Sequence, residues 1–232
     1  MSPAPQKPTT LDPRTEGLLE WMGAQPWAHL VVLGGGVALK HYVDYRPTKD
    51  CDAWWDAAAT TDERQRVLEE VAAALLRLNP GCSLRRDDWG DVNSLAVVEQ
   101  GKVVFSFQVA QRTSQLAPYL SSAWGGLRIE SLEDNIASKM CAFVDRGVGR
   151  DFSDVYQIHH RLGWSAAQLW QLWQTKNPPR AVGDAKTKAR VKFEVLVRSR
   201  PLERIQPEAQ RRELAAARRW FQVEMLADEP GH

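Results

Sequence analysis

The chain has 232 residues, 44% of them hydrophobic and 25% charged, which is ordinary for a globular protein able to bury a sizeable core. Its formal net charge of +1 excludes both a global basic field for nucleic acid and an acidic field typical of disorder, so a polyanion site must come from local clusters of arginine and lysine. The three widely spaced cysteines match no metal-ligand spacing and predict a reduced, intracellular protein.

The start of the chain is rich in proline. Residues 1–13 predict a flexible tail and contain no apolar stretch of the kind that marks a signal peptide. No later run approaches the roughly 18 apolar residues that a membrane span needs. We therefore expect a cytoplasmic protein with no membrane partner.

The remaining chain predicts strands and helices that alternate at first and give way to helices. The expected elements are helix 15–22, strand 29–33, helix 37–45, strand 50–55, helix 61–78, strands 94–98 and 102–110, and helices 131–146, 151–162 and 165–175. Asp87, Asp88 and Asp91 indicate a polar loop. The order is typical of an α/β (α+β) core over 14–125, followed by a helical C-terminal domain over 126–232.

A triple glycine after the first buried strand is the central feature. Gly34, Gly35 and Gly36 let the backbone turn tightly and approach a ligand, and the following helix directs N–H groups at that space, which suits phosphate. Asp50 and Asp52 are two apart on a strand, so both carboxylates face one side. Two such carboxylates predict an oxygen-rich site for Mg²⁺ or Mn²⁺.

Two widespread phosphate-binding motifs fit the glycines less well. A Walker A loop requires Gly-Lys-Ser/Thr after its spacer, which this chain lacks. A Rossmann fingerprint fits Gly34 and Gly36, but Leu39 stands at its third small position. A plain tight turn together with a surface Asp-x-Asp remains the structural alternative.

The glycine and aspartate elements carry a family resemblance. Gly35-Gly-Val-Ala-Leu39 and Arg46-Pro-Thr-Lys-Asp-Cys-Asp52 resemble the Gly-Gly-Thr-Ala-Leu and Arg-x-Thr-x-Asp-hydrophobic-Asp blocks of the AbiEii/AbiGii toxins. These toxins belong to the nucleotidyltransferase superfamily. The resemblance implies a nucleotidyltransferase-type mixed sheet, with a nucleoside triphosphate as substrate.

A second constellation lies over residues 131–154. Lys139 and Arg146 are seven apart and share a helical face. Asp151 and Asp154 stand in the first turn of the next helix, where the helix dipole also favours acidic residues, so capping and solvated charge are structural alternatives.

The whole string, Ser131-Leu-Glu-Asp through Arg150-Asp-x-x-Asp154, resembles the C-terminal signature of the AbiEii family. The resemblance implies that Lys139 contacts the nucleotide phosphates and that Asp151 or Asp154 orients or activates the acceptor. Arg146 and Arg150 belong to the same signature and are counted as nucleotide-binding.

One expected acid is missing. Many nucleotidyltransferases have a third carboxylate on a neighbouring strand, often as general base. In strand 102–110 the corresponding positions hold Ser106 and Gln108, and Glu99 in the adjacent turn is the nearest acid. Either Asp151 or Asp154 substitutes, or catalysis is weak.

The two motifs predict a metal-dependent nucleotidyltransferase that transfers NMP from an NTP to a hydroxyl acceptor. Family resemblance implies a toxin–antitoxin or phage-defence system, with tRNA as acceptor and a cognate antitoxin as partner. The C-terminal part is rich in arginine and lysine from Lys186 to Arg219, which suits tRNA or another RNA, although a solvated helical surface is the structural alternative. The alternative function is a non-catalytic nucleotide- or RNA-binding module on the same fold.

Overall fold

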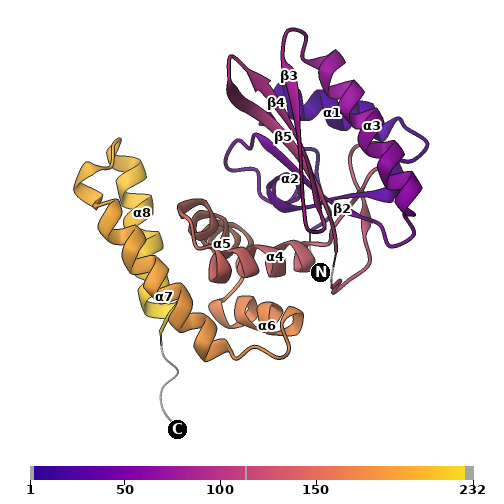
Figure 1. Cartoon of the computed structure of the whole chain (residues 1–232). Helices are drawn as coiled ribbons and strands as arrows, with labels where there is room; N and C mark the ends of the chain where they lie inside the picture. Colours follow the sequence, from indigo (N-terminus) through magenta and orange to yellow (C-terminus); the bar gives the residue numbers. More distant parts are fainter. Residues whose placement is uncertain (1–2, 113, 228–232) are drawn as a thin grey trace. The chain divides into compact units, whose positions relative to one another are not determined.

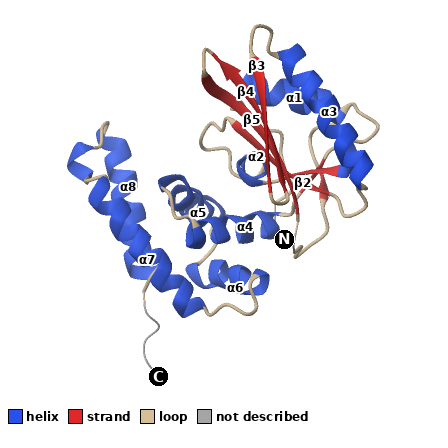
Figure 2. Cartoon of the chain, viewed as in Figure 1, coloured by secondary structure: helices blue, strands red, loops and turns tan. Residues whose placement is uncertain are grey.

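The structure is a computed structural model that describes residues 3–112 and 114–227. Its residues cluster into two compact units, Met1–Asn135 and Ile136–His232. The first unit holds the strands, and the second is helical (Figure 2). The domain ranges inferred from sequence, divided at residue 125/126, stay a prediction.

The first unit is built on a seven-stranded mixed sheet in the order β3-β4-β5-β2-β1-β7-β6. β2 lies between β1, with which it is antiparallel, and β5, with which it is parallel, while β7 runs parallel to β1 on its other side. The mixed sheet confirms the predicted fold class. Its strands are β1 (Val31–Leu33), β2 (Asp50–Trp55), β3 (Ser83–Trp89), β4 (Val92–Glu99), β5 (Lys102–Gln111), β6 (Leu120–Ser121) and β7 (Arg128–Ile129).

Helices α1 (Pro13–Gly23) and α3 (Thr61–Leu78) pack against each other, and α3 lies along the sheet (Figure 1). Apolar residues recur on one face of α3, and its N-terminus is closed by a capping box between Thr60 and Glu63, the arrangement that satisfies two free N–H groups at once. Buried side chains from both helices share a core with alternate residues of β2, among them Cys51 and Trp55. Burial of the odd positions of β2 leaves its even positions, which include both aspartates, on the opposite face.

Helix α2 (Gly35–Lys40) is shorter than the predicted 37–45 and begins within the glycines. The chain then bends, and the buried Lys40 ammonium holds the bend by donating to Asp44 Oδ1 at 2.5 Å and to the Arg46 carbonyl at 2.7 Å. The N-terminal segment is bonded to the same region: Thr9 N–H donates to Asp44 Oδ2 at 2.8 Å. These bonds set the path of the chain between the glycines and Asp50.

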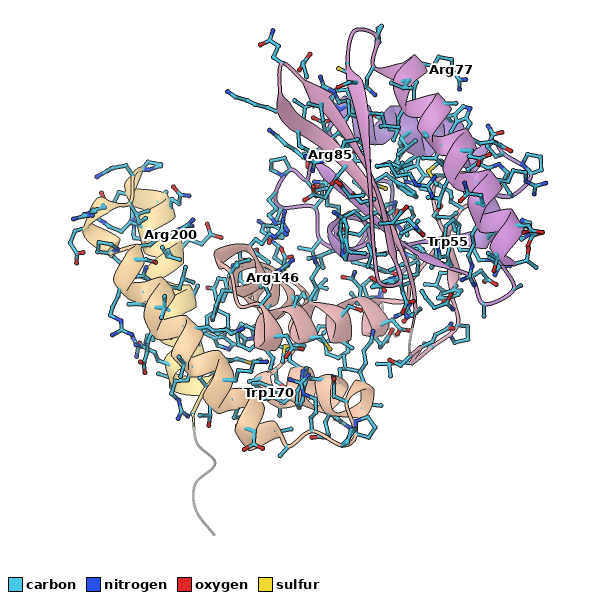
Figure 3. The ribbon with its side chains drawn as sticks, viewed as in Figure 1. Trp55, Arg77, Arg85, Arg146, Trp170 and Arg200 are labelled. Carbon is cyan, nitrogen blue, oxygen red and sulfur yellow. The ribbon has the colours of Figure 1, made fainter. Side chains whose placement is uncertain are left out.

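The polar loop predicted around Asp87, Asp88 and Asp91 is wrong for its first two residues, which lie in β3. Within the described chain, this strand pairs only with β4 and forms one edge of the sheet. Its side chains are mostly exposed and charged, with Arg85 (Figure 3) donating to Asp87 at 2.7 Å along one face. Charged edge strands resist pairing with other chains, and they lack the apolar alternation by which strands are recognised.

The second unit consists of helices around an aromatic core. Phe143 lies within 5.1–5.6 Å of Phe152 and Phe221, measured between ring centroids. No helix in the described part of the chain is long and apolar enough to cross a membrane. The helices are α4 (Leu132–Asp145, which begins in the first unit), α5 (Gly149–Leu162), α6 (Ala166–Lys176), α7 (Val182–Ser199) and α8 (Glu208–Trp220).

Candidate active site

The glycine turn joins the end of β1 to α2 and is closed by the neighbouring strand β2. Gly34 N–H donates to the Asp52 carbonyl at 2.9 Å. Gly35 has a φ of +56°, which favours glycine, and a side chain there would overlap Asp52 Oδ2. The backbone of the turn therefore lies directly against the Asp52 carboxylate.

Asp52 and Asp50 occupy the partly exposed face of β2. Asp52 Oδ2 accepts from Gly36 N–H at 3.4 Å, and Asp50 Oδ1 accepts from the Ser106 hydroxyl at 2.9 Å. Cys51 between them points into the core, where burial, with a smaller contribution from both aspartates, raises the pKa of its thiol. The thiol is thus kept neutral on the other face, and the two carboxylates supply the charge at the turn.

The register between β2 and β5 shows what stands beside the two aspartates. Ser106 pairs with Asp50, and Gln108 pairs with Asp52. These are the two positions at which a third carboxylate was sought in the sequence. The face beside the aspartates on β5 therefore carries a hydroxyl and an amide, and Ser106 uses its hydroxyl to hold Asp50.

Sequence reasoning missed a carboxylate on the other side of the turn. Glu130 follows β7, is fully buried and accepts from Asn135 Nδ2 at 2.6 Å. Its other oxygen accepts from Trp54 Nε1 at 3.1 Å and lies 3.2 Å from Arg112 Nη2. β7 has only two residues, so no periodic pattern marked this region; the positions of Glu130 and Asn135 beside the Ser131-Leu-Glu-Asp string were the available signal.

The site fits a divalent ion bound jointly with phosphate. Among the described residues, no group of three or more His, Cys, Asp or Glu side chains could hold a metal alone. Mg²⁺ is commonly held by one or two carboxylates together with substrate phosphates and water. Asp50 and Asp52 supply that donor set on one face of β2, and the Asp52 carboxylate lies directly against the Gly35 backbone.

Lys139 and Asp154 form a buried ion pair within the second unit. Lys139 Nζ on α4 lies 2.7 Å from Asp154 Oδ2 on α5, and the two side chains are 10% and 1% exposed. A compact cation held in this way is suited to meet a phosphate as a point charge. The contact brings together two residues of the second predicted constellation.

Asp151 has a capping role in the same unit. Its carboxylate accepts from Val148 N–H at 3.0 Å, closing the start of α5, and receives two bonds from Arg146 at 2.5 and 3.0 Å. Arg146 is labelled in Figure 3, and Arg150 is exposed one residue before Asp151. The structural alternative considered for Asp151 is thus present in the structure, while the predicted catalytic and nucleotide-binding roles of these residues stay predictions.

Comparison with known protein families identifies the family to which this chain belongs. The model of the family described as "Nucleotidyl transferase AbiEii toxin, Type IV TA system" matches residues 18–230. The chain belongs to this family. The match spans the glycine turn, the aspartate pair and the Lys139–Asp154 pair, and it confirms the resemblance inferred from both motifs. The protein is therefore a nucleotidyltransferase of the AbiEii toxin family.

The comparisons with curated proteins and with solved structures are less informative than the family match. No curated protein matches the chain. Among solved structures, the Megavirus polyadenylate synthase is similar over 75% of this chain, with 13% sequence identity and a TM-score of 0.40. The chain spans 37% of that synthase chain.

Proposed function

We propose that this AbiEii-family protein is a metal-dependent enzyme that transfers NMP from an NTP to a hydroxyl acceptor on RNA. The observation that carries the proposal is the Asp52 carboxylate held against the Gly35 and Gly36 backbone, with Asp50 two residues away on the same face of β2. Backbone N–H groups beside a pair of carboxylates suit a triphosphate that arrives with a divalent ion.

Each residue has a separate task in this proposal. Asp50 and Asp52 would hold Mg²⁺ or Mn²⁺, and the bound ion would offset the negative charge of the triphosphate. The backbone of Gly34, Gly35 and Gly36 lets the phosphates approach closely. Lys139 contributes a positive charge to the phosphates, and Asp154 holds its ammonium in place.

In the transfer step, the acceptor hydroxyl oxygen forms a bond to the α-phosphorus. The bond from that phosphorus to the bridging oxygen of the β-phosphate breaks, and pyrophosphate leaves with the bonding electrons. The hydroxyl proton passes to a base. The candidates are Asp151, whose carboxylate is also engaged by Arg146 and by the cap of α5, and Asp154, whose carboxylate is also engaged by Lys139.

The proposed acceptor is RNA, with tRNA as its first candidate, and the proposed setting is a toxin–antitoxin or phage-defence system with a cognate antitoxin. Support comes from the family description, which names a toxin of a type IV system, and from local charge in the second unit. Exposed arginines there include Arg200 (Figure 3). Clustered guanidinium groups bind phosphate backbones without reading sequence. The exposed arginines of the α7–α8 region are Arg198, Arg200, Arg204, Arg212 and Arg219.

A second candidate function is a binding module that holds nucleotide or RNA without turnover. It is favoured by one observation, the hydroxyl and amide of Ser106 and Gln108 beside the aspartates in place of a carboxylate. Such a module would bind NTP normally and release no pyrophosphate.

The experiment that separates the two candidates uses each of the four NTPs labelled at the α-phosphate, with total cellular RNA and Mg²⁺. The proposed enzyme attaches label to RNA and releases pyrophosphate, and Asp52→Asn reduces both by at least about 100-fold, as expected for a group that acts on the transition state. Asp88→Asn on the exposed edge strand is the matched control and should transfer normally. Label transfer that persists in Asp52→Asn would refute the enzyme, and nucleotide binding without transfer would favour the module.

A further inference from the structure

A buried residue of α4 is bonded to the glycine turn and to a buried carboxylate. Asn135 Nδ2 donates both to Glu130 Oε1 at 2.6 Å and to the Gly35 carbonyl at 3.0 Å. Both partners are acceptors, so the amide nitrogen must face them. Asn135 Oδ1 has no hydrogen-bond partner within the described chain, an unfavourable state for a buried oxygen. The side chain is therefore oriented by its contact with the turn and with Glu130.

Trp54 connects Glu130 to the same turn by a second path. Its indole N–H donates to Glu130 Oε2 at 3.1 Å. The same ring edge fills the space that a side chain at Gly34 would need. Glu130 thus fixes Trp54 against Gly34 and Asn135 against Gly35, while Asp52 contacts Gly35 and Gly36 from β2.

Glu130 lies on the far side of the glycine turn from the aspartate strand. It follows β7, which is separated from β2 by β1 in the sheet. Its carboxylate is fully buried, and its oxygens are used by Asn135, Trp54 and Arg112. Arg112 also pairs with the equally buried Asp134, so one guanidinium serves both carboxylates. This environment suits a residue that orients others and does not suit a third metal ligand.

We propose that Glu130 and Asn135 are positioning residues that hold the Gly34–Gly36 turn in the geometry which receives the nucleotide phosphates. The inference rests on the proposed function for the identity of the ligand. The positioning role itself rests on the bonds from Asn135 to the Gly35 carbonyl and from Trp54 to Glu130.

Exchanging the amide and the carboxylate between positions 135 and 130 separates two bonds: the one from Asn135 to the Gly35 carbonyl and the one from Asn135 to Glu130. Asn135→Asp removes the donor to Gly35 and places a second carboxylate against Glu130, so we expect it to destabilise the fold. Asn135→Asp combined with Glu130→Gln restores a hydrogen bond between positions 130 and 135, because the new amide donates to the new carboxylate. Position 135 still offers no donor to the Gly35 carbonyl.

The matched control is Asn79→Asp at the end of α3. Asn79 is also a buried asparagine of the first unit, and its Nδ2 donates to the Leu75 carbonyl at 2.8 Å. Its Oδ1 accepts from Arg14 Nε at 3.0 Å. The substitution therefore removes the same kind of bond at the C-terminal end of α3, outside the glycine turn.

Amide hydrogen exchange over residues 34–38 and binding of a non-hydrolysable NTP analogue with Mg²⁺ test the proposal. In the double variant we expect exchange to be about ten-fold faster at these amides and analogue binding to be about ten-fold weaker, the loss expected when one buried partner of a hydrogen bond is removed. Global unfolding should be close to that of the wild-type protein. Asn79→Asp should change neither local exchange nor binding.

The proposal would be overturned if the double variant exchanged these amides and bound the analogue as the wild-type protein does. It would also be overturned if Asn79→Asp accelerated exchange at the turn as much as the double variant does. The exchange measurement needs no catalysis or nucleotide. A wild-type protein that fails to bind the analogue would therefore contradict the proposed function, while the exchange comparison would still decide whether Asn135 holds the turn.

Discussion

At Gly35, both the local backbone conformation and the contact with Asp52 require glycine. Its φ of +56° is rarely adopted by other residues, and a side chain there would overlap Asp52 Oδ2. The sequence predicted a tight turn at the glycines and a carboxylate pair nearby. It could not show that Asp52 directly contacts the turn, because that contact depends on how β2 aligns with β1.

Gly35→Ala should therefore destabilise the protein and abolish nucleotide transfer. The left-handed backbone alone costs a non-glycine residue roughly 1–2 kcal/mol, and displacement of Asp52 adds to that cost. Gly101→Ala is the control, since its φ is +76° and no atom lies within 4 Å of the added carbon. Chemical denaturation and transfer assays should show a larger stability loss at Gly35 and full activity for the control; equal losses would show that the contact with Asp52 is unimportant.

His41 makes a pH-dependent contribution to stability. Trp124 Nε1 donates to His41 Nε2 at 2.9 Å, so Nδ1 must carry the ring proton that it donates to the Val37 carbonyl at 2.8 Å. Burial is the main cause that lowers the pKa of His41, and Lys40 adds to it, while the bond to Val37 and the charge of Asp44 oppose it. The folded protein thus favours a neutral ring.

Because the pKa is lowered in the folded state, the unfolded chain binds the proton first. Stability from His41 is present above the unfolded pKa of about 6.5 and falls as pH decreases below it, by up to about 1.4 kcal/mol for each pH unit until the folded ring is protonated. His41→Gln keeps an acceptor for Trp124 and a donor for Val37 without titrating. Urea denaturation from pH 7.5 to 5 should show a smaller pH slope for His41→Gln; an unchanged slope would exclude His41 as the source.

Among the elements, those with strong periodic patterns were predicted well from the sequence. Helix α3, with its apolar face and the stop at Asn79, was placed at its observed bounds, and the β4–β5 hairpin was recognised. β3 was missed because its exposed, charged side chains carry no apolar alternation. β7 has two residues, too few to show a period. Glu130 follows it, and the bond from Trp54 that engages Glu130 comes from 76 residues earlier in the chain.

The pair formed by Lys139 of α4 and Asp154 of α5 can be tested for structural and functional roles separately. Lys139→Met leaves a buried carboxylate without its cation, which typically costs about 3–5 kcal/mol. Combining it with Asp154→Leu removes both charges and should recover most of that stability. Transfer activity should remain lost, since the proposed contact with phosphate needs the ammonium. Recovered activity in the double variant would show that the pair serves the fold alone.

At the scale of the whole molecule, the family match over residues 18–230 includes both units and both predicted constellations. The first unit presents the aspartates and the glycine turn, and the second presents the buried Lys139–Asp154 pair. The sequence identified both sets because each contains a local motif. Networks assembled from distant residues, such as Glu130 with Trp54 and Asn135, became apparent only in the fold.

The central claim is that Asp50 and Asp52 together hold a divalent ion for the triphosphate. Calorimetric binding of a non-hydrolysable NTP analogue, with and without Mg²⁺, tests it without requiring an acceptor. We predict that Mg²⁺ tightens binding about ten-fold or more in the wild-type protein and in Asp88→Asn, and that Asp50→Asn and Asp52→Asn each lose most of this gain. An equal gain from Mg²⁺ in the Asp52→Asn variant would contradict the claim.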